Sequence, residues 1–379
     1  TRDDHRRRAE LVRTCAAEKG RAVGLLVDLQ GPKIRIGGFA KGPVQLRNGK
    51  RFVIDSALGG HDGTEEGVGT SYAALVDDVE NGDRLLLDDG NIVLRVEKIE
   101  GSAIVTRVIV GGELSDSKGI NKQGGGLSAE ALTEKDHEDI RFAAEIQADY
   151  VGVSFVRHGA DVETARMLLR ASGSDAHVVS KVERREAVDN IEEIIATSDV
   201  IMVARGDLGV EIGDAEVPGV QKSLISQSRT QNTVVITATQ MMQSMVTSPQ
   251  PTRAEVSDVA NAVLDGTDAV MLSAETAVGR HPVKVVAAVD RVCLAAERHS
   301  SVLVSGHRME SRFSSIEETI AMATMYTANH YNVVGILTLT ESGVTAKWMS
   351  RISSGMPIFG VTRNVDTERR MALYRGVYP

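Results

Sequence analysis

The chain is poor in aromatic residues, in cysteine and in long apolar runs. Aromatic side chains make up 3% of its 379 residues, which is too few for the base-stacking platforms of single-strand binders. The 43 lysines and arginines are outnumbered by 52 aspartates and glutamates, and the resulting net charge of −9 excludes a general polyanion binder. No apolar run approaches the roughly 20 residues that a membrane-spanning helix needs. We therefore expect neither nucleic acid nor membrane as a partner.

The chain has only two cysteines, Cys15 and Cys293, and they lie far apart. This spacing excludes a disulfide framework and a zinc-binding pattern, and it indicates a reducing cytoplasm. We therefore predict a cytoplasmic protein.

The sequence does contain a repeated alternation of short apolar segments with helical ones. Strands are expected at residues 23–30, 149–156, 177–183, 199–205, 233–240 and 268–275. Helices are expected at 1–20, 134–147, 160–171, 185–197 and 252–264. Apolar strands separated by helices predict a parallel sheet covered on both faces. Because a closed barrel of this kind has eight strands, we predict an α/β fold, a (β/α)8 TIM barrel whose first two strands are missing from this chain.

Two further segments depart from this alternation. Short period-two strands are expected at 44–46, 51–54, 84–87, 92–99 and 103–110, which predicts an inserted β-barrel lid domain that ends at three consecutive glycines. A polar stretch after residue 298 predicts a linker to an α/β unit with helices at 316–329 and 344–350 and strands at 333–339 and 358–361. Two strands are too few for an independent sheet, so we expect this unit to be truncated. The predicted domains are a barrel A domain at 1–36 and 128–298, a B lid domain at 37–127 and a partial, regulatory C domain at 299–379.

Charged residues end two neighbouring strands of the predicted barrel, where barrel enzymes carry their chemistry. Lys181 and Glu183 are two residues apart on one strand and therefore point to the same side. They form either a structural ion pair or part of a site, and their place at a strand end favours the site. Asp207 ends the next strand and is expected to face Glu183. Two carboxylates with open positions suit Mg²⁺ or Mn²⁺, which take further oxygens from water and substrate.

Other residues near the strand ends are candidates for binding an anion. Gly206 and Gly209 would let the backbone approach a ligand and offer its N–H groups to it. Thr239 and Ser273 end the next two strands, where a hydroxyl either relays protons or is a satisfied polar group.

Arg35 lies at the entry to the inserted domain, where its guanidinium could bind phosphate oxygens with two N–H groups. The sequence has neither a phosphate-binding P-loop nor a dinucleotide-binding glycine motif between strand and helix, which disfavours P-loop kinases and Rossmann dehydrogenases. The residues alone therefore predict a Mg²⁺-dependent barrel enzyme that acts on a small oxyanion under a mobile lid.

Motifs along the whole chain, in order, resemble those of the pyruvate kinase family. They are 27–35 (VDLQGPKIR), 180–183 (SKVE), 201–209 (IMVARGDLG), 238–241 (ATQM), 251–266 (PTRAEVSDVANAVLDG) and 271–276 (MLSAET). The resemblance implies a barrel, a lid and an α/β C domain, assembled as a homotetramer. It also implies a phosphotransferase that moves the phosphoryl group of phosphoenolpyruvate to ADP in glycolysis, giving pyruvate and ATP through an enolate.

The resemblance also implies roles for single residues. Glu183 and Asp207 would hold the divalent ion, while Lys181 would stabilise the transferring phosphoryl group and the enolate. The substrate-binding residues that it implies are Lys181, Ala204, Arg205, Gly206, Asp207 and Thr239. The nucleotide-binding residues that it implies are Arg35 and Lys118, and the residues near the proton-delivering water chain are Thr239 and Ser273.

The chain departs from the family pattern at its monovalent-cation site, which would include Asp28 and Leu29. Lys33 stands where potassium-dependent members have glutamate, and its fixed ammonium can replace the charge of K⁺. We therefore expect that K⁺ is not required. The family's Asn-Phe-Ser-His-Gly segment would lie just before Thr1, so part of the active site is expected to be missing.

A second departure concerns the effector. Residues 340–345 (TESGVT) stand where relatives activated by a sugar bisphosphate have a more basic loop. Because Glu341 repels phosphate, classical fructose-bisphosphate activation is disfavoured, and another phosphorylated effector, a sugar phosphate or AMP, is expected.

Two alternatives remain open at this stage. Another metal-dependent barrel acting on pyruvate or its enolate, such as an aldolase or lyase, would share the pair of carboxylates but would not need the lid or Arg35. A chain that only binds metabolites or partners is the other alternative, and the joint presence of Lys181, Glu183 and Asp207 disfavours it.

Overall fold

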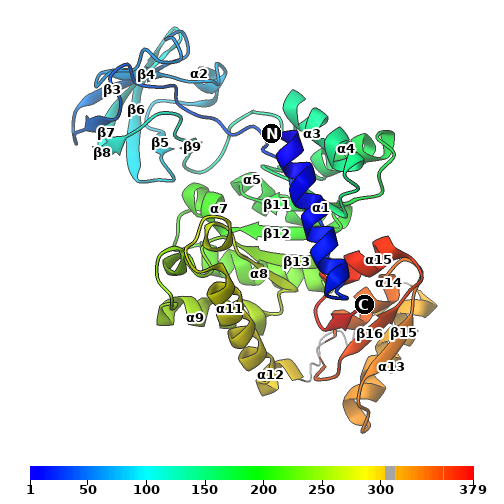
Figure 1. Ribbon diagram of the computed structural model, residues 1–379. Helices are drawn as coiled ribbons and strands as arrows, with labels where there is room; N and C mark the ends of the chain where they lie inside the picture. Colours follow the sequence, from blue (N-terminus) through cyan, green and yellow to red (C-terminus); the bar gives the residue numbers. More distant parts are fainter. Residues whose placement is uncertain (304–311, 314, 353) are drawn as a thin grey trace.

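The computed structural model describes residues 1–303, 312–313, 315–352 and 354–379, so part of the predicted linker, 304–311, lies outside the described residues. Its centre is a parallel sheet in which six strands follow one another in chain order (Figure 1). The strands are β1 (Leu26–Asp28), β10 (Tyr150–Val153), β11 (His177–Val182), β12 (Val200–Ala204), β13 (Val234–Ala238) and β14 (Ala269–Met271). All six were predicted, although the structure makes each of them shorter than its apolar run.

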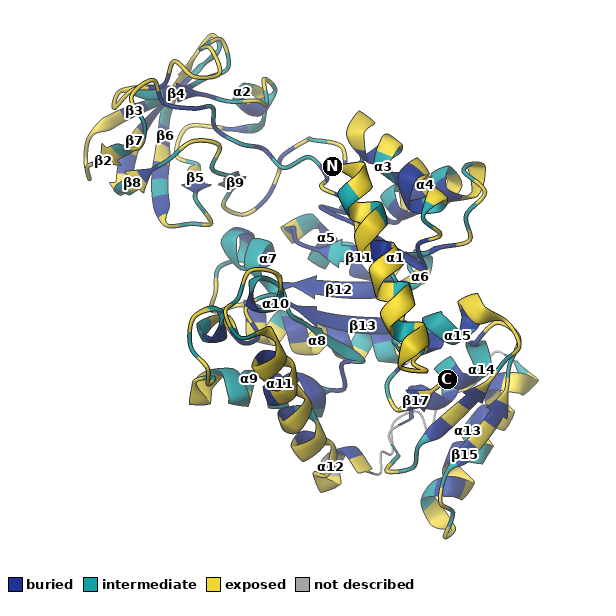
Figure 2. Ribbon diagram, in the orientation of Figure 1, coloured by how far each residue is buried: buried dark blue, intermediate teal, exposed yellow. Residues whose placement is uncertain are grey.

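Helices connect these strands and cover the sheet. They are α3 (Glu134–Glu145), α4 (Gly159–Ala171), α5 (Arg185–Asp189), α6 (Ile191–Thr197), α7 (Arg205–Ile212), α8 (Val217–Thr230), η1 (Gln243–Val246), α9 (Arg253–Asp265), α10 (Ala274–Ala277), α11 (Pro282–Glu297) and α12 (Ser300–Leu303). The amino-terminal helix α1 (Arg2–Glu18) crosses in front of the sheet and is mostly exposed (Figure 2). Among the described helices, none is long and apolar enough to cross a membrane.

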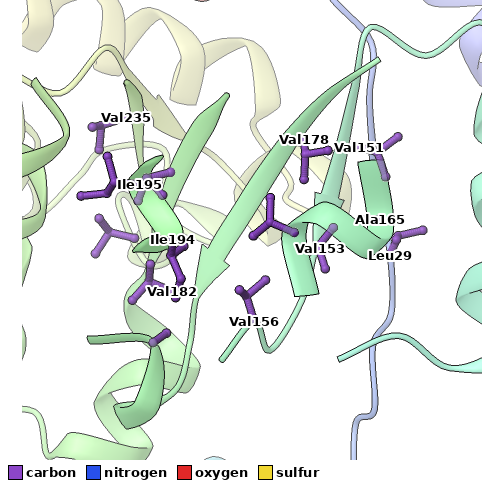
Figure 3. Close-up of a cluster of buried hydrophobic side chains, with 14 of the residues drawn as sticks. Leu29, Val151, Val153, Val156, Ala165, Val178, Val182, Ile194, Ile195 and Val235 are labelled. Atoms are coloured by element: carbon purple, nitrogen blue, oxygen red, sulfur yellow. The ribbon is translucent and has the colours of Figure 1, made fainter. Parts of the chain in front are cut away.

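The sheet is stabilised by branched apolar side chains packed between strands and helices. Every residue of β10, β12 and β13 is buried, as expected for parallel strands covered on both faces. Val151, Val153 and Val178 from the strands belong to one hydrophobic cluster with Ile194 and Ile195 from α6, and Figure 3 shows these side chains. Burial of these side chains supplies the main favourable term in folding.

The predicted helix at 185–197 is wrong as a single helix, because it is two helices that meet at Asn190. The Nδ2 group of Asn190 donates to the backbone oxygen of Arg157 at 3.0 Å and lies 3.0 Å from Nδ1 of His158. This side chain is thus bound to the loop after β10, and the backbone leaves the α conformation at its position.

The β-rich unit lies apart from the sheet and is joined to it by two chain segments (Figure 1). It contains β2 (Val44–Leu46), β3 (Arg51–Asp55), β4 (Gly67–Gly69), α2 (Leu75–Asp78), β5 (Arg84–Leu87), β6 (Ile92–Glu100), β7 (Ala103–Val110), β8 (Gly112–Leu114) and β9 (Ile120–Lys122). Six of these strands form one sheet in the order β4-β3-β7-β6-β5-β9, and β2 pairs with β8. Alternating residues of these strands form a separate hydrophobic core, which agrees with the period-two pattern.

The carboxy-terminal unit contains α13 (Ile316–His330), β15 (Ile336–Leu339), α14 (Val344–Ser350), β16 (Ile358–Val361), α15 (Val365–Met371) and β17 (Val377–Tyr378). Its sheet has three parallel strands instead of the two predicted, because the two-residue β17 pairs with β16. Its apolar side chains share one core with side chains of the central strands, such as Tyr150, Val200 and Val234.

Candidate active site

The carboxyl ends of the six parallel strands bring several of the predicted site residues to one edge of the central sheet. Asp28 ends β1, Lys181 and Glu183 lie at the end of β11, and Thr239 follows β13. A cavity of about 950 Å³ opens at this edge. The predicted residues among those that line it are Asp28, Leu29, Lys33, Lys181, Glu183 and Asp207.

The ammonium of Lys181 has three acceptors around it. Its Nζ lies 3.0 Å from Glu183 Oε1, 2.8 Å from Ser154 Oγ and 3.2 Å from Asp28 Oδ1. The two carboxylates raise the pKa of Lys181 against the opposing effect of its burial, which is the larger single contribution. The lysine therefore stays charged, and it forms an ion pair with Glu183 as well as lining the cavity.

Glu183 is almost completely buried. Burial raises the pKa of this carboxyl, and the negative charge of Asp207 adds to the increase, whereas Lys181 opposes it. Its Oε2 accepts a hydrogen bond from the N–H of Phe155 at 2.8 Å. A second cation beside Glu183 and Asp207 would relieve the cost of keeping both carboxylates charged.

Asp207 lies in the first turn of α7 and lines two cavities of several hundred Å³. Its Oδ1 is 3.8 Å from Nζ of Lys33. Both residues also line a second cavity of about 700 Å³, bounded by Asp89 and Gly90 of the β-rich unit, by Gly206 of α7 and by Gln240 in the turn after β13. Lys33 thus places a positive charge between the two cavities.

Thr239 and Gln240 follow β13 in a conformation that side-chain residues rarely adopt, with φ of 69° and 56°. The Oγ1 of Thr239 accepts the N–H of Gly206 at 3.0 Å, and its backbone oxygen accepts from Nη2 of Arg205 at 2.7 Å. Nη1 of Arg205 also pairs with Asp258 at 2.7 Å. These contacts maintain the strained turn, which is typical of functional sites. They also show that the Gly206 N–H, expected to face an anion, already has an acceptor.

Ser273 follows β14 but is not among the residues that line either cavity. The next turn is held by Glu275, which is fully buried and accepts the N–H groups of Ser273 at 2.7 Å and of Met242 at 3.1 Å. Glu275 therefore ties the ends of β13 and β14 together.

Arg35 and Lys118 are not brought to the cavity edge. Nη1 of Arg35 donates to the backbone oxygen of Ser117 at 2.7 Å, and Nζ of Lys118 pairs with Asp88 at 2.6 Å. Both cations belong to the β-rich side of the molecule, so only a movement of that unit would bring them to Lys181.

The sequence analysis missed Ser154 and Phe155, which contact Lys181 and Glu183. Both lay inside the apolar run that was expected to be a strand. The signal that could have identified Ser154 is its polar side chain at the carboxyl end of that strand.

Among the described residues, no group of three or more His, Cys, Asp and Glu side chains is arranged to hold a metal ion. The donors of Glu183 and Asp207 are nevertheless carboxylate oxygens that line one cavity. Such a pair fits Mg²⁺ or Mn²⁺, which keep several waters and are often bound by one or two carboxylates together with substrate phosphates. The residues present therefore fit a divalent ion.

Comparisons with known proteins agree with this geometry. The family model described as pyruvate kinase, barrel domain, matches residues 1–286, and that described as pyruvate kinase, alpha/beta domain, matches residues 318–379. The whole chain is 58% identical to pyruvate kinase II of Salmonella typhimurium and covers 79% of that protein. It is 56% identical to the pyruvate kinase of Haemophilus influenzae, of which it covers 80%. A more distant relative, the pyruvate kinase of Mycobacterium intracellulare, is 42% identical over 98% of this chain, and the match covers 78% of that protein.

Proposed function

The chain belongs to the pyruvate kinase family and transfers the phosphoryl group of phosphoenolpyruvate to ADP in glycolysis, and we propose that Lys181, Glu183 and Asp207 perform this transfer. One observation carries the proposal, namely the charged ammonium of Lys181 beside two carboxylates at the carboxyl ends of parallel strands. Phosphoryl transfer needs positioning and charge stabilisation more than covalent help from the protein. A fixed cation beside the reacting phosphoryl group supplies that stabilisation.

Members of this family are generally metal-dependent, and here Glu183 and Asp207 would hold Mg²⁺ or Mn²⁺. The ion would neutralise charge on the substrate oxygens. Lys181 binds the transferring phosphoryl group and then stabilises the negative charge of the enolate. Of the three partners of Lys181, Asp28 is the most exposed, so Lys181 releases Asp28 when it binds the substrate.

The substrate carboxylate would be bound by the backbone of residues 204–207, with the side chain of Arg205 supporting it, and by the Thr239 hydroxyl. On binding, the substrate takes over the Gly206 N–H from Thr239. The Thr239 hydroxyl then donates to the substrate carboxylate, and its lone pairs become available to accept from the proton-delivering water chain near Ser273.

Arg35 and Lys118 would contact the phosphates of ADP once the β-rich unit closes as a lid over the sheet. Nucleotide phosphates would replace their acceptors in this structure, which are a backbone oxygen for Arg35 and the Asp88 carboxylate for Lys118.

Asp28 and Leu29 occupy the monovalent-cation position of the family, and Lys33 supplies the charge that K⁺ supplies elsewhere. Its ammonium, 3.8 Å from Asp207, supports this assignment. We expect that K⁺ is not required.

The finer architecture that we propose is a (β/α)8 barrel A domain at 1–36 and 128–298, a B lid at 37–127 and a C domain at 299–379, in a cytoplasmic homotetramer. The C domain would bind a phosphorylated effector, a sugar phosphate or AMP. Glu341 lies 3.4 Å from Arg363 on its exposed surface, so a phosphate would have to displace this carboxylate.

The experiment that tests the site compares pyruvate formation by the chain and by Lys181→Met, in Mg²⁺ buffers with K⁺ and with Na⁺ only. We expect loss of kcat by at least a thousandfold in the variant, as for removal of a main charge-stabilising group, and equal rates of the unsubstituted chain in the two buffers. Lys135→Met is the control, because Lys135 lines the same cavity but pairs with Asp139. Full activity of Lys181→Met would contradict the proposed site, whereas turnover only with K⁺ would contradict the role of Lys33.

A further inference from the structure

The turn after β10 contacts both residues on which the proposed chemistry depends. We propose that Ser154 is a positioning residue of the reaction, whose hydroxyl holds the Lys181 ammonium in line for the transferring phosphoryl group and connects it to the hinge of the β-rich unit. This inference rests on the role proposed for Lys181.

The hydrogen bonds of Ser154 determine which way its hydroxyl points. Its Oγ lies 2.9 Å from the backbone oxygen of Leu29, which can only accept, so the hydroxyl proton points to Leu29. The lone pairs of the same oxygen are then left for Nζ of Lys181, 2.8 Å away. Ser154 is 2% exposed, so water does not compete for either bond. The serine therefore offers the lysine a fixed acceptor.

Ser154 is also the acceptor that the reaction leaves in place. An ammonium has three N–H donors, and those of Lys181 point to Asp28, Ser154 and Glu183. The Asp28 side chain is 55% exposed and makes the longest of the three contacts, so it is the partner given up to a phosphoryl oxygen. Glu183 would share its charge with the metal ion. The neutral, buried serine then sets the direction of the lysine throughout the transfer.

The same turn holds the neighbouring carboxylate through its backbone. Phe155 has φ of 57°, which is a strained conformation for a bulky residue. Its N–H donates to Oε2 of Glu183 at 2.8 Å, and its ring lies 5.3 Å from the guanidinium of Arg184. One turn thus positions Lys181 through a side chain and Glu183 through the main chain.

The turn also packs against Gly31, where the chain leaves the sheet for the β-rich unit. A Cβ at Gly31 would lie only 2.9 Å from Cβ of Ser154 and 3.0 Å from Cδ2 of Phe155. The N–H of Gly31 donates to Asp136 at 3.1 Å, which fixes this residue on α3. The serine that holds Lys181 therefore packs directly against the fixed point from which the chain leaves for the β-rich unit.

The test compares Ser154→Ala and Ser154→Cys with Ser180→Ala, with circular dichroism to verify that each protein is folded. Ser180 is the matched control, since it is fully buried beside Lys181 on the other face of β11 and bonds to Ser198 at 2.6 Å. We expect kcat to fall about tenfold in Ser154→Ala, the effect of losing one hydrogen bond to a charged group. The KM for phosphoenolpyruvate should change less than twofold, because the serine acts on the transition state. Ser154→Cys fills the same space with a weak acceptor and should behave like Ser154→Ala.

Three results would overturn the inference while leaving the proposed function intact, provided that Lys181→Met is inactive. They are an unchanged kcat in Ser154→Ala, a kcat restored by Ser154→Cys, and an equal loss in Ser180→Ala. The last two would show that packing, and not the hydrogen bond, matters at this position. If Lys181→Met is active, the proposed function itself fails.

Discussion

At the scale of single residues, burial decides how the acidic groups beside the site titrate. Glu211 of α7 is 3% exposed, and burial raises its pKa to about 7. The charges of Glu186 and Asp207 add to this increase, whereas the N–H of Arg185, 2.9 Å away, and the charge of Arg184 oppose it. The folded chain therefore holds a proton on Glu211 at pH values where the unfolded chain, with an ordinary pKa of 4.5 at this group, has lost it.

This shift predicts a pH dependence of stability. Between pH 4.5 and about 7 the folded state binds more protons at Glu211 than the unfolded state does. The contribution of Glu211 to the free energy of unfolding therefore falls as the pH rises through this window. Glu211→Gln keeps an acceptor for Arg185 and should remove the dependence, with a gain of about 2–3 kcal/mol at pH 8. Urea unfolding of both proteins from pH 5 to 8, in metal-free buffer, measures this effect. The prediction would be contradicted if the free energy of unfolding fell with pH equally in both proteins. It would also be contradicted if the exposed control Glu192→Gln changed this pH dependence as much as Glu211→Gln does.

At the scale of elements, the segment that returns from the β-rich unit is held by the helices that follow β11 and β12. Gly124, Gly125 and Gly126 all have positive φ, of 89°, 81° and 90°. The N–H of Gly124 donates to the backbone oxygen of Glu211 at 3.0 Å, and that of Gly126 donates to Oε1 of Glu186 at 2.5 Å. The chain that returns from the β-rich unit is thus clamped by α5 and α7, the helices that carry Glu186 and Glu211.

Gly125→Ala should impair this clamp more than Gly124→Ala does. Both substitutions introduce the same backbone strain, about 1–3 kcal/mol. A Cβ at Gly125 would also lie 2.9 Å from the Glu186 carboxylate, whereas nothing lies within 4 Å of one at Gly124. We expect similar losses of Tm from strain, but a severalfold lower kcat only in Gly125→Ala. Thermal unfolding and steady-state kinetics test this, and equal kcat values in the two variants would disprove the clamp.

At the scale of the whole molecule, the same aspartate contact recurs three times along the amino-terminal edge of the central sheet. Asp149, Asp199 and Asp268 directly precede β10, β12 and β14. Each accepts a backbone N–H at the start of the neighbouring strand; the donors are Leu25 at 2.7 Å, Val178 at 2.9 Å and Val235 at 2.9 Å. The arginine partners of the first two are Arg13 and Arg166, from helices α1 and α4. The partner of the third is Arg351, which comes from the carboxy-terminal unit.

Because the third aspartate, Asp268, is paired with an arginine of the carboxy-terminal unit, we predict that Arg351 couples this unit to the central sheet. The Arg351 and Asp268 side chains are 1% and 0% exposed, so Arg351→Met would remove the ion-pair partner of a buried carboxylate and cost about 3–5 kcal/mol. Denaturant unfolding should then show the carboxy-terminal unit melting before the sheet. Arg166→Met is the matched control, because its pair with Asp199 is partly exposed, at 18% and 25%, and should cost less. Equal losses, or a single unchanged transition for Arg351→Met, would refute the coupling.

The local pattern of the sequence was sufficient to predict the six central strands and the place of Lys181 and Glu183 at the carboxyl end of one of them. Strand and helix periods are properties of consecutive residues, and so is the rule that places Lys181 and Glu183 on one face of a strand. The family resemblance is equally a property of the sequence, since its motifs are contiguous. The comparisons confirm the family.

Only the tertiary structure decided which partners these residues have. Ser154 and Asp28 reach Lys181 from 27 and 153 residues away in the chain, and no local pattern specifies such distances. The strained φ angles of Phe155 and Thr239 are imposed by their surroundings against the preference of the residues themselves. Strand β17 forms because β16 offers it a free edge. Propensity and period act between neighbours in sequence, whereas burial, charge pairing and hydrogen bonding act between neighbours in space. The surroundings of Lys181 are built by interactions of the second kind.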